Sequence, residues 1–387
     1  MPLKPINAYI QNMPRSGIRR IMDSATAPDI LHLEVGQPDF PTPEPVIRAA
    51  CEAAADKDGR YTRYTPNRGY ASLRKAIVKK LKEENGIHTA ENRILVTPGS
   101  NYGIMIALAV LLNEGDEVLV PDPGYVNYAS LPPQYGCGVT RYPLYESDGF
   151  VPRIESIAGC ITPKTKVIVH NSPSNPTGAV CSESFIKDLI EIARVHNLYI
   201  LSDEAYEHIL FEGSHVSPAQ YDEDGGVVSI FSFSKSYAMT GWRLGYVVSS
   251  EPIANALEKQ QELGVSCAPS ISQKAAEAAL ALDHQHIDAM LEQYRRRRDL
   301  AMDILKKNNL FTYTPQGAFY VLIDISSTGM DSDTFADRLL NEQRVAVAPG
   351  ATFGAIAGQY IRVSMATEDS VVAEGLERVC AFVKTTS

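Results

Sequence analysis

The chain lacks features that would assign it to a membrane, a secreted scaffold or a nucleic-acid surface. Its longest apolar stretch, 104–112, falls short of the ~20 residues that a bilayer span needs. The N-terminus has no apolar signal-peptide core. A formal net charge of −10 argues against nucleic acid or an anionic membrane as the main partner.

Cysteine and histidine show no metal-binding or disulfide pattern. The six cysteines are scattered without a CxxC pair, which suits reduced thiols in the cytoplasm. No histidines have HExxH spacing, so we expect no metal site. The composition that is present, 44% apolar and 21% charged residues, is that of a globular protein. The length predicts about two to three domains.

Short apolar runs alternate with helical patterns through the middle of the chain. This rhythm predicts a largely parallel sheet with helices on both faces. The expected strands are 94–97, 117–120, 166–170, 198–202 and 227–231, and the expected helices are about 99–112 and 182–196. Further on, we expect a long helix at about 285–307, strands near 317–324, 345–350 and 360–364, and a closing helix.

The change in character near residue 285 predicts two units. We expect a large ligand-binding domain over 44–284 and a smaller α/β domain over 285–387. The Pro-punctuated N-terminal arm, 1–43, should belong to the smaller domain or pack on a partner subunit.

The most informative segment is 232–246, which carries Lys235 among hydroxyl and small residues. Apolar runs on both sides predict strand, loop and strand, with the lysine at the end of a buried strand. Burying a charged lysine there costs free energy unless the charge interacts with a ligand or is removed. A Schiff base with an aldehyde removes that charge and uses the amine as a nucleophile. The alternative is a solvated lysine in a surface loop.

Other chemically suggestive residues also follow predicted strands. Ligands gather at the carboxyl ends of the strands in such sheets. The residues found at or just after strand ends are Ser100, His170, Asn175, Asp203 and Lys235. Asp203 suits a protonated ring nitrogen or caps the next helix. Asn175 lies in the loop 171–178, which can aim its amide into a site or simply make a turn.

Three more signals have a functional and a structural interpretation. The segment 97–103 opens a helix whose free N–H groups suit a phosphate, or is a Gly-rich turn. Tyr125 can stack on a planar ligand or pack beside a turn. Arg362, in a predicted strand, can bind a carboxylate in bidentate fashion or form a structural ion pair.

In this order, the motifs resemble those of the fold-type I, pyridoxal-phosphate (PLP)-dependent aminotransferases of class I/II, with an aspartate/aromatic aminotransferase-like pattern. The resemblance runs from about Val35 to Arg362, and its most specific pieces are 175–178, 203–206 and 234–245. It implies a large domain with a mostly parallel, seven-stranded-type sheet and a smaller α/β domain. It also implies transfer of the amino group of an L-amino acid to a 2-oxo acid through PLP.

The resemblance implies catalytic roles for three residues. Lys235 would bind PLP as a Schiff base and then, once freed, shuttle the proton. Asp203 would pair with the pyridinium nitrogen. Tyr206, together with Asn175, would bond the phenolic oxygen of the ring.

The resemblance also implies how the cofactor and substrate are held. The residues implied for the phosphate are Ser100, Asn101, Ser232, Ser234 and Arg243. Tyr125 would stack on the ring, and His170 would lie behind the aspartate or be a satisfied core histidine. Arg362, with Asn175 and the backbone at Gly36, would bind the substrate. A clamped α-carboxylate favours loss of the Cα proton over loss of carbon dioxide.

Tyr64 matches a tyrosine that such enzymes lend to the phosphate of the neighbouring subunit. The resemblance therefore implies a homodimer with shared active sites. The substrate side chain stays open among dicarboxylic, aromatic and branched-chain types. Gly17 and Asn101 supply no cation, whereas Arg15 or Arg19 is a candidate. Ile18 and Tyr61 are compatible with apolar or aromatic side chains.

Two other functions are compatible with the same residues. One is another PLP-dependent reaction that begins at the Cα–H bond, such as β- or γ-elimination or replacement, ring closure or oxidation. The other is a non-catalytic protein that senses PLP or an amino acid. Such regulators normally add a basic DNA-binding domain, and the first 40 residues are too few for one.

Overall fold

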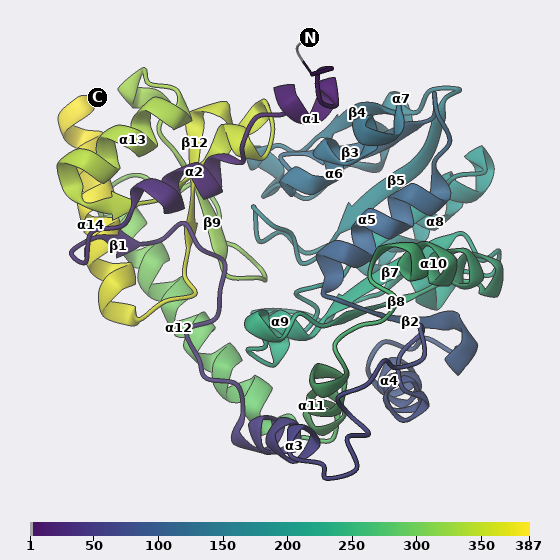
Figure 1. Cartoon of the computed structure of the whole chain (residues 1–387). Coiled ribbons are helices and arrows are strands. Elements are labelled where there is room, and N and C mark those ends of the chain that lie inside the picture. The colour runs from purple at the N-terminus through teal and green to yellow at the C-terminus, as the bar shows by residue number, and fades with distance from the viewer. Residues whose placement is uncertain (1–2) are drawn as a thin grey trace.

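The computed structural model describes residues 3–387 and contains a seven-stranded sheet (Figure 1). Its strands, in spatial order, are β2 (Ile94–Thr97), β8 (Gly245–Val248), β7 (Val227–Ser232), β6 (Tyr199–Asp203), β5 (Thr165–Asn171), β3 (Glu117–Asp122) and β4 (Gly138–Pro143). Within this sheet β8 alone runs against the others, since its pairings with β2 and β7 are antiparallel and the remaining pairings are parallel. The expectation of a mostly parallel sheet is confirmed.

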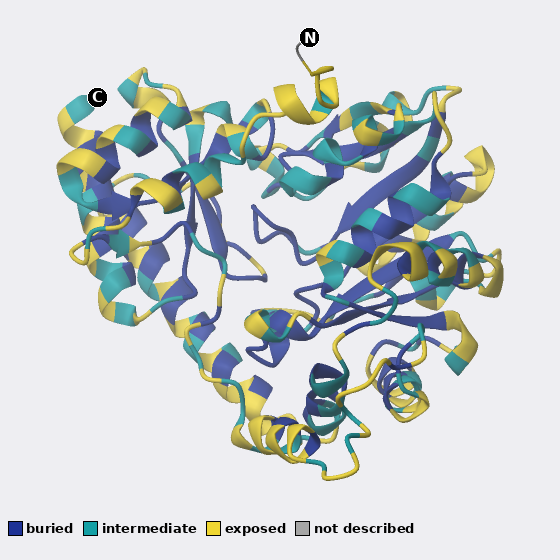
Figure 2. Ribbon diagram, in the orientation of Figure 1, coloured by how far each residue is buried: buried dark blue, intermediate teal, exposed yellow. Residues whose placement is uncertain are grey.

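Helices cover both faces because successive strand side chains point to opposite sides. Val167 and Val169 of β5 belong to the apolar cluster of α5 (Ser100–Leu111) and α10 (Glu251–Gly264). Ile168 belongs to the cluster of α8 (Glu183–His196). A third cluster joins the β2 edge to α3 (Glu44–Ala54), α4 (Ala71–Glu84) and α11 (Ser270–Leu280). Figure 2 shows the central strands of the large sheet as buried and the outer helix faces as a mixture of intermediate and exposed residues.

The C-terminal part forms separate sheets together with the N-terminal arm. An antiparallel sheet has the order β11 (Ala348–Pro349), β12 (Tyr360–Ser364), β9 (Tyr320–Asp324). In the arm, β1 (Leu31–His32) pairs in parallel with β10 (Val345–Ala346). The helices of this part are α2 (Gly17–Ser24), α12 (Gln285–Lys307), α13 (Ser332–Gln343) and α14 (Asp369–Thr386). Figure 1 shows the purple arm running beside the yellow C-terminal elements.

The structure corrects three details of the predicted elements. The single strand expected at 345–350 is two short strands, because β10 pairs with β1 whereas β11 pairs with β12. The loop expected after β7 contains the helix α9 (Phe233–Ser236), whose first turn is capped by Ser232. The edge strand β4 was not predicted, since most of its side chains are not buried and its pattern is weak. None of the helices in 3–387 has both the length and the hydropathy of a bilayer span.

Candidate active site

A cavity of about 800 Å³ lies at the carboxyl ends of the central strands. The sequence-predicted residues that line it are Gly36, Ser100, Asn101, Tyr125, Asn175, Asp203, Tyr206, Ser232, Ser234, Lys235, Arg243 and Arg362. Tyr64 is not among the lining residues, and it is 90% exposed. The fold therefore brings together residues from the arm, the large sheet and the C-terminal sheet.

Lys235 reaches this cavity from α9. Its Nζ donates a hydrogen bond to the backbone oxygen of Gly36 at 2.6 Å. Desolvation, with the positive charges of Arg362 and Arg243, lowers the pKa of Lys235 to about 8. The amine can therefore act as a base or nucleophile near neutral pH.

Asp203 ends β6 with a buried carboxylate. Its Oδ2 accepts a hydrogen bond from the Tyr128 hydroxyl at 2.6 Å, and its Oδ1 accepts one from the Ala205 N–H at 3.2 Å. Burial outweighs these contacts and raises the pKa of Asp203 to about 6. The sequence reasoning missed Tyr128, although it follows Tyr125 by three positions in the same segment.

His170 does not lie behind this carboxylate. Because Asn171 and Asp203 are paired neighbours on the α5 face, the preceding His170 points to the other face, where its ring lies 6.1 Å from that of Phe185. Burial lowers the pKa of His170 to about 3. Its Nε2 has no hydrogen-bond partner within residues 3–387, so it is a core histidine but not a satisfied one.

The start of α5 and the segment before β8 form a corner suited to an anion. Gly99 has a φ of +86° and immediately precedes the first residue of α5. A Cβ there would lie 2.6 Å from Nη2 of Arg243, so the glycine lets the guanidinium approach the helix N-terminus. Ser232 and Ser234 line the same cavity, as do Thr240 and Gly241, which were not predicted.

Arg362 of β12 is buried and presents its planar guanidinium group to the cavity. Its Nη1 donates to Asn175 Oδ1 at 3.0 Å, and its Nη2 donates to the backbone oxygen of Glu34. The guanidinium lies 4.3 Å from the Tyr320 ring centroid and 4.9 Å from that of Phe353. Its Nε has no hydrogen-bond partner in the described chain. A fork held in this way is suited to a planar carboxylate.

Tyr320, which the sequence reasoning also missed, connects two predicted residues. Its hydroxyl lies 2.9 Å from that of Tyr206. A Cβ on Gly36 would lie 1.8 Å from the same hydroxyl, so this close approach requires glycine. Burial raises the pKa of Tyr206, which keeps the phenol protonated as a hydrogen-bond donor.

Helix α2 and the residue before it form part of the cavity mouth. Ile18 and Arg19 line the main cavity, together with Ser16 and Met22. Gly17 and Arg15 instead line a neighbouring cavity of about 330 Å³. Arg15 pairs with Asp23 at 2.6 Å.

Tyr61 is not among the residues that line the main cavity, and it packs edge-on against Tyr70. Arg19 is therefore the basic residue of the predicted mouth segment that lines the main cavity.

The donor set fits PLP. The helix N-terminus and Arg243 suit its phosphate. The buried Asp203 carboxylate suits a protonated ring nitrogen, which would offset the cost of its burial. Lys235 lines the same cavity as both groups.

Comparison with known proteins agrees with this arrangement. The family described as aminotransferase class I and II matches residues 28–379. An aspartate aminotransferase of Pyrococcus horikoshii is 36% identical over 94% of both chains. Aromatic-amino-acid aminotransferase 2 of Thermococcus litoralis is 35% identical over 95% of this chain and 96% of its own. The structure of Thermus thermophilus aspartate aminotransferase with maleate has a TM-score of 0.93 at 34% identity, covering 98% of this chain and 100% of that chain.

Proposed function

Because this chain belongs to the class I and II aminotransferases, a PLP-dependent family that transfers amino groups, we propose that its cavity binds PLP and acts on an L-amino acid and a 2-oxo acid. When bound, PLP supplies an aldehyde that accepts the amino group and a ring that withdraws electrons from the reacting carbon. The fit of the donor set to this cofactor supports the proposal.

Two groups of cavity residues would hold the two ends of the cofactor. The residues proposed for the phosphate are Ser100, Asn101, Ser232, Ser234 and Arg243. Asp203, supported by Tyr128, would bind the protonated ring nitrogen. Tyr125 would stack on the ring, and Tyr206 and Asn175 would bind its phenolic oxygen.

Lys235 and Arg362 act on the substrate. The Nζ of Lys235, whose pKa is lowered to about 8, takes the proton from the substrate Cα and later returns it. Arg362, with Asn175 and the backbone at Gly36, binds the α-carboxylate. This contact directs the Cα–H bond toward the base, so the proton leaves in preference to carbon dioxide.

The observation that carries the proposal is the convergence of Lys235, Asp203 and Arg362 on one cavity. The test is a spectral screen of the PLP-loaded protein against the common L-amino acids. We expect the absorbance of the bound cofactor to fall with an amino acid alone and to return with a 2-oxo acid. Failure of every amino acid in the panel would overturn the proposal. Ammonia or thiol release without a 2-oxo acid would identify an elimination reaction instead.

We further propose that the substrates include dicarboxylic and aromatic amino acids, with 2-oxoglutarate as an acceptor. The relatives are named as aspartate and aromatic aminotransferases, which supports both classes. Arg19 at the mouth offers a cation for a second carboxylate, and Ile18 beside it offers apolar surface for a ring.

The proposed active unit is a homodimer with shared sites. The exposure of Tyr64 supports this, since the ring lines no part of its own cavity and is free to reach a neighbouring one. The separate sheets support a division into 44–284 and 285–387, with the arm 1–43 joining the latter. Location in the cytoplasm stays a prediction from the composition.

A further inference from the structure

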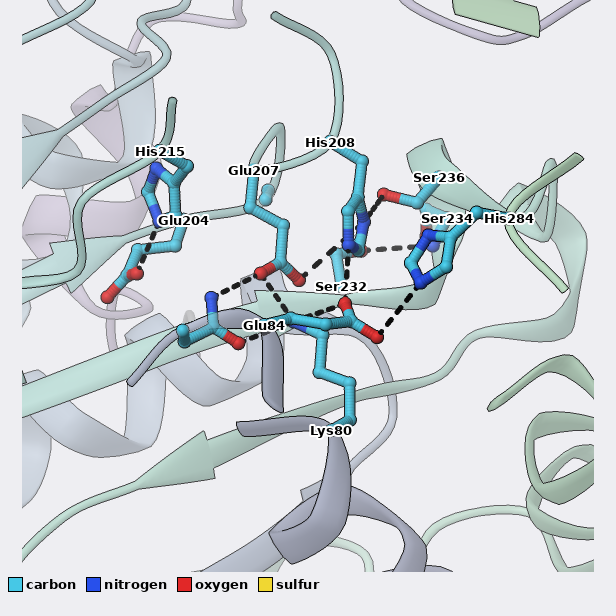
Figure 3. A network of polar contacts seen from close by, with 12 residues as sticks. Lys80, Glu84, Glu204, Glu207, His208, His215, Ser232, Ser234, Ser236 and His284 are labelled. Carbon is cyan, nitrogen blue, oxygen red and sulfur yellow. Dashed lines mark hydrogen bonds and ion pairs between the residues drawn. The ribbon is translucent and has the colours of Figure 1, made fainter. Parts of the chain in front are cut away.

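The turn that follows β6 carries residues of a polar network (Figure 3), in addition to residues that line the cavity. Asp203 and Tyr206 line the cavity. The turn also carries Glu204, Glu207 and His208, which hydrogen-bond to side chains that do not line the cavity. None of these three has a part in the chemistry proposed above.

Glu207 ties this turn to the C-terminal end of α4. Its carboxylate accepts hydrogen bonds from Nζ of Lys80 and, at 2.7 Å, from Nδ2 of Asn85. Although desolvation opposes the charge, Lys80 and nearby histidines lower the pKa of Glu207 to about 2. Loss of either partner of such a buried pair would leave an uncompensated charge, so the contact is a firm anchor.

His208 joins the same helix end to α9. Its Nε2 lies 2.8 Å from Oε2 of Glu84, the last residue of α4, and its Nδ1 lies 2.9 Å from Oγ of Ser236. Because a carboxylate only accepts, Nε2 donates to Glu84. In the neutral ring, Nδ1 then accepts the Ser236 hydroxyl hydrogen. His284 approaches the other oxygen of Glu84 at 3.6 Å from the exposed side.

We propose that His208 is a positioning residue for Lys235, which it reaches through the Ser236 hydroxyl. Helix α9 has four residues, too few to hold its shape alone, so the direction of Lys235 depends on contacts made by its neighbours. Ser236 is 2% exposed, and its hydroxyl bonds to His208. Lys235 is therefore linked through His208 to the turn that carries Asp203 and Tyr206, and Glu207 anchors this turn at the end of α4. The inference rests on the proposed role of Lys235.

The test is a double-mutant cycle on Ser236→Ala and His208→Ala. Two readouts are used: hydrogen exchange of 232–239 in the cofactor-free protein, and the rate of the amino-acid half-reaction in the PLP-loaded protein. We expect each single change to speed exchange and to slow the half-reaction about ten- to a hundredfold, as a small displacement of a reacting group does. The half-reaction rate of the double variant should be no lower than that of either single variant, because both changes break the same contact.

Two conservative variants separate the two ends of the imidazole. His208→Asn keeps an amide near the position of Nδ1, where it can bond to Ser236, and should retain most of the half-reaction rate. His208→Gln places its amide near Glu84 instead, so the contact with Ser236 is lost and the rate should fall. Ser217→Ala is the matched control, because it removes a buried hydroxyl that donates to Glu204 of the same turn at 3.0 Å but makes no hydrogen bond to α9 within residues 3–387. It should lower the unfolding temperature while leaving the half-reaction rate nearly unchanged.

Additive losses in the cycle, or an equal loss of rate in Ser217→Ala, would overturn the inference. The Asn variant also keeps the test valid if His208→Ala fails to fold. If the wild-type protein converts no amino acid, the proposed function fails. Exchange in the cofactor-free protein would then still decide whether His208 holds α9.

Discussion

At the cavity wall, an amine and a carboxylate are both shifted toward their neutral forms. Desolvation lowers the pKa of Lys235 to about 8 and raises the pKa of Asp203 to about 6. A neutral amine is what nucleophilic and base chemistry requires. A carboxylate that is costly to ionise gains most from a cationic partner, so binding of a protonated ring nitrogen favours ionised Asp203.

Replacing Lys235 by Met should stabilise the cofactor-free protein at pH 7. The lysine pKa falls from 10.5 to about 8 on folding, so below about pH 8 the folded state carries a charged amine that its surroundings disfavour. This cost falls as the pH rises from about 8 through 10.5, and it disappears only above 10.5, where the amine is neutral in both states. Urea unfolding should show the variant to be more stable at pH 7, with an advantage that becomes clearly smaller by pH 10. A stability difference that stays constant over this range would contradict the lowered pKa.

Arg19 should decide between dicarboxylic and aromatic substrates. Arg19→Gln removes the cation that lines the cavity mouth, so kcat/KM for aspartate should fall about tenfold or more, the loss expected for a charged hydrogen bond. The value for phenylalanine should change less than about twofold, because a ring makes no such bond. Arg15→Gln is the matched control, since Arg15 pairs with Asp23 and does not line this cavity. Equal losses for both substrates would contradict a role in specificity.

At the scale of elements, the sequence correctly predicted helices whose formation depends on residues that are close together in the chain. Helix α8 was expected after Ser182, which caps it by accepting a hydrogen bond from the Phe185 N–H. Helix α12 was expected at the observed residues because its pattern is long. By contrast, α9 has four residues and shows no period, and the division of 345–350 depends on which distant strand each half meets.

The turn into α5 should depend on the absence of a side chain at Gly99. Gly99→Ala would bring a Cβ within 2.6 Å of Nη2 of Arg243, so the guanidinium must shift from its place beside the helix N-terminus. We expect the dissociation constant for PLP to rise about tenfold or more. The matched control is Gly115→Ala, because Gly115 has a φ of +88°, close to the +86° of Gly99, but no atoms near its Cβ position. It should cost stability without changing PLP binding in a fluorescence titration. The same PLP affinity in both variants would show that the close approach to Arg243 is unimportant.

At the scale of the whole molecule, the site depends on contacts between distant parts of the chain. Residues that lie at recognisable motifs, such as Asp203, Lys235 and Arg362, were predicted and meet at one cavity. Tyr128 and Tyr320 have no motif of their own, and their roles follow only from where the fold brings their hydroxyls. The support at His208 is of the same kind, because its partner Glu84 is 124 residues away.

Tyr64 provides the test of a shared site between subunits. The proposed homodimer draws Lys235 from one subunit and Tyr64 from the other, so Lys235→Ala and Tyr64→Ala should each impair both sites of their own dimers. If the two variants exchange subunits, each hybrid dimer contains one site with both native residues and one with neither. Random mixing in equal amounts should therefore restore activity to about a quarter of wild type, because half of the dimers are hybrids and one of their two sites is native.

Mixtures held under conditions that prevent exchange serve as the control, and they should show only the summed activities of the separate variants. If exchange is verified and activity still does not exceed that sum, Tyr64 acts within its own chain or not at all. In that case a neighbouring active site does not explain why the Tyr64 ring is 90% exposed.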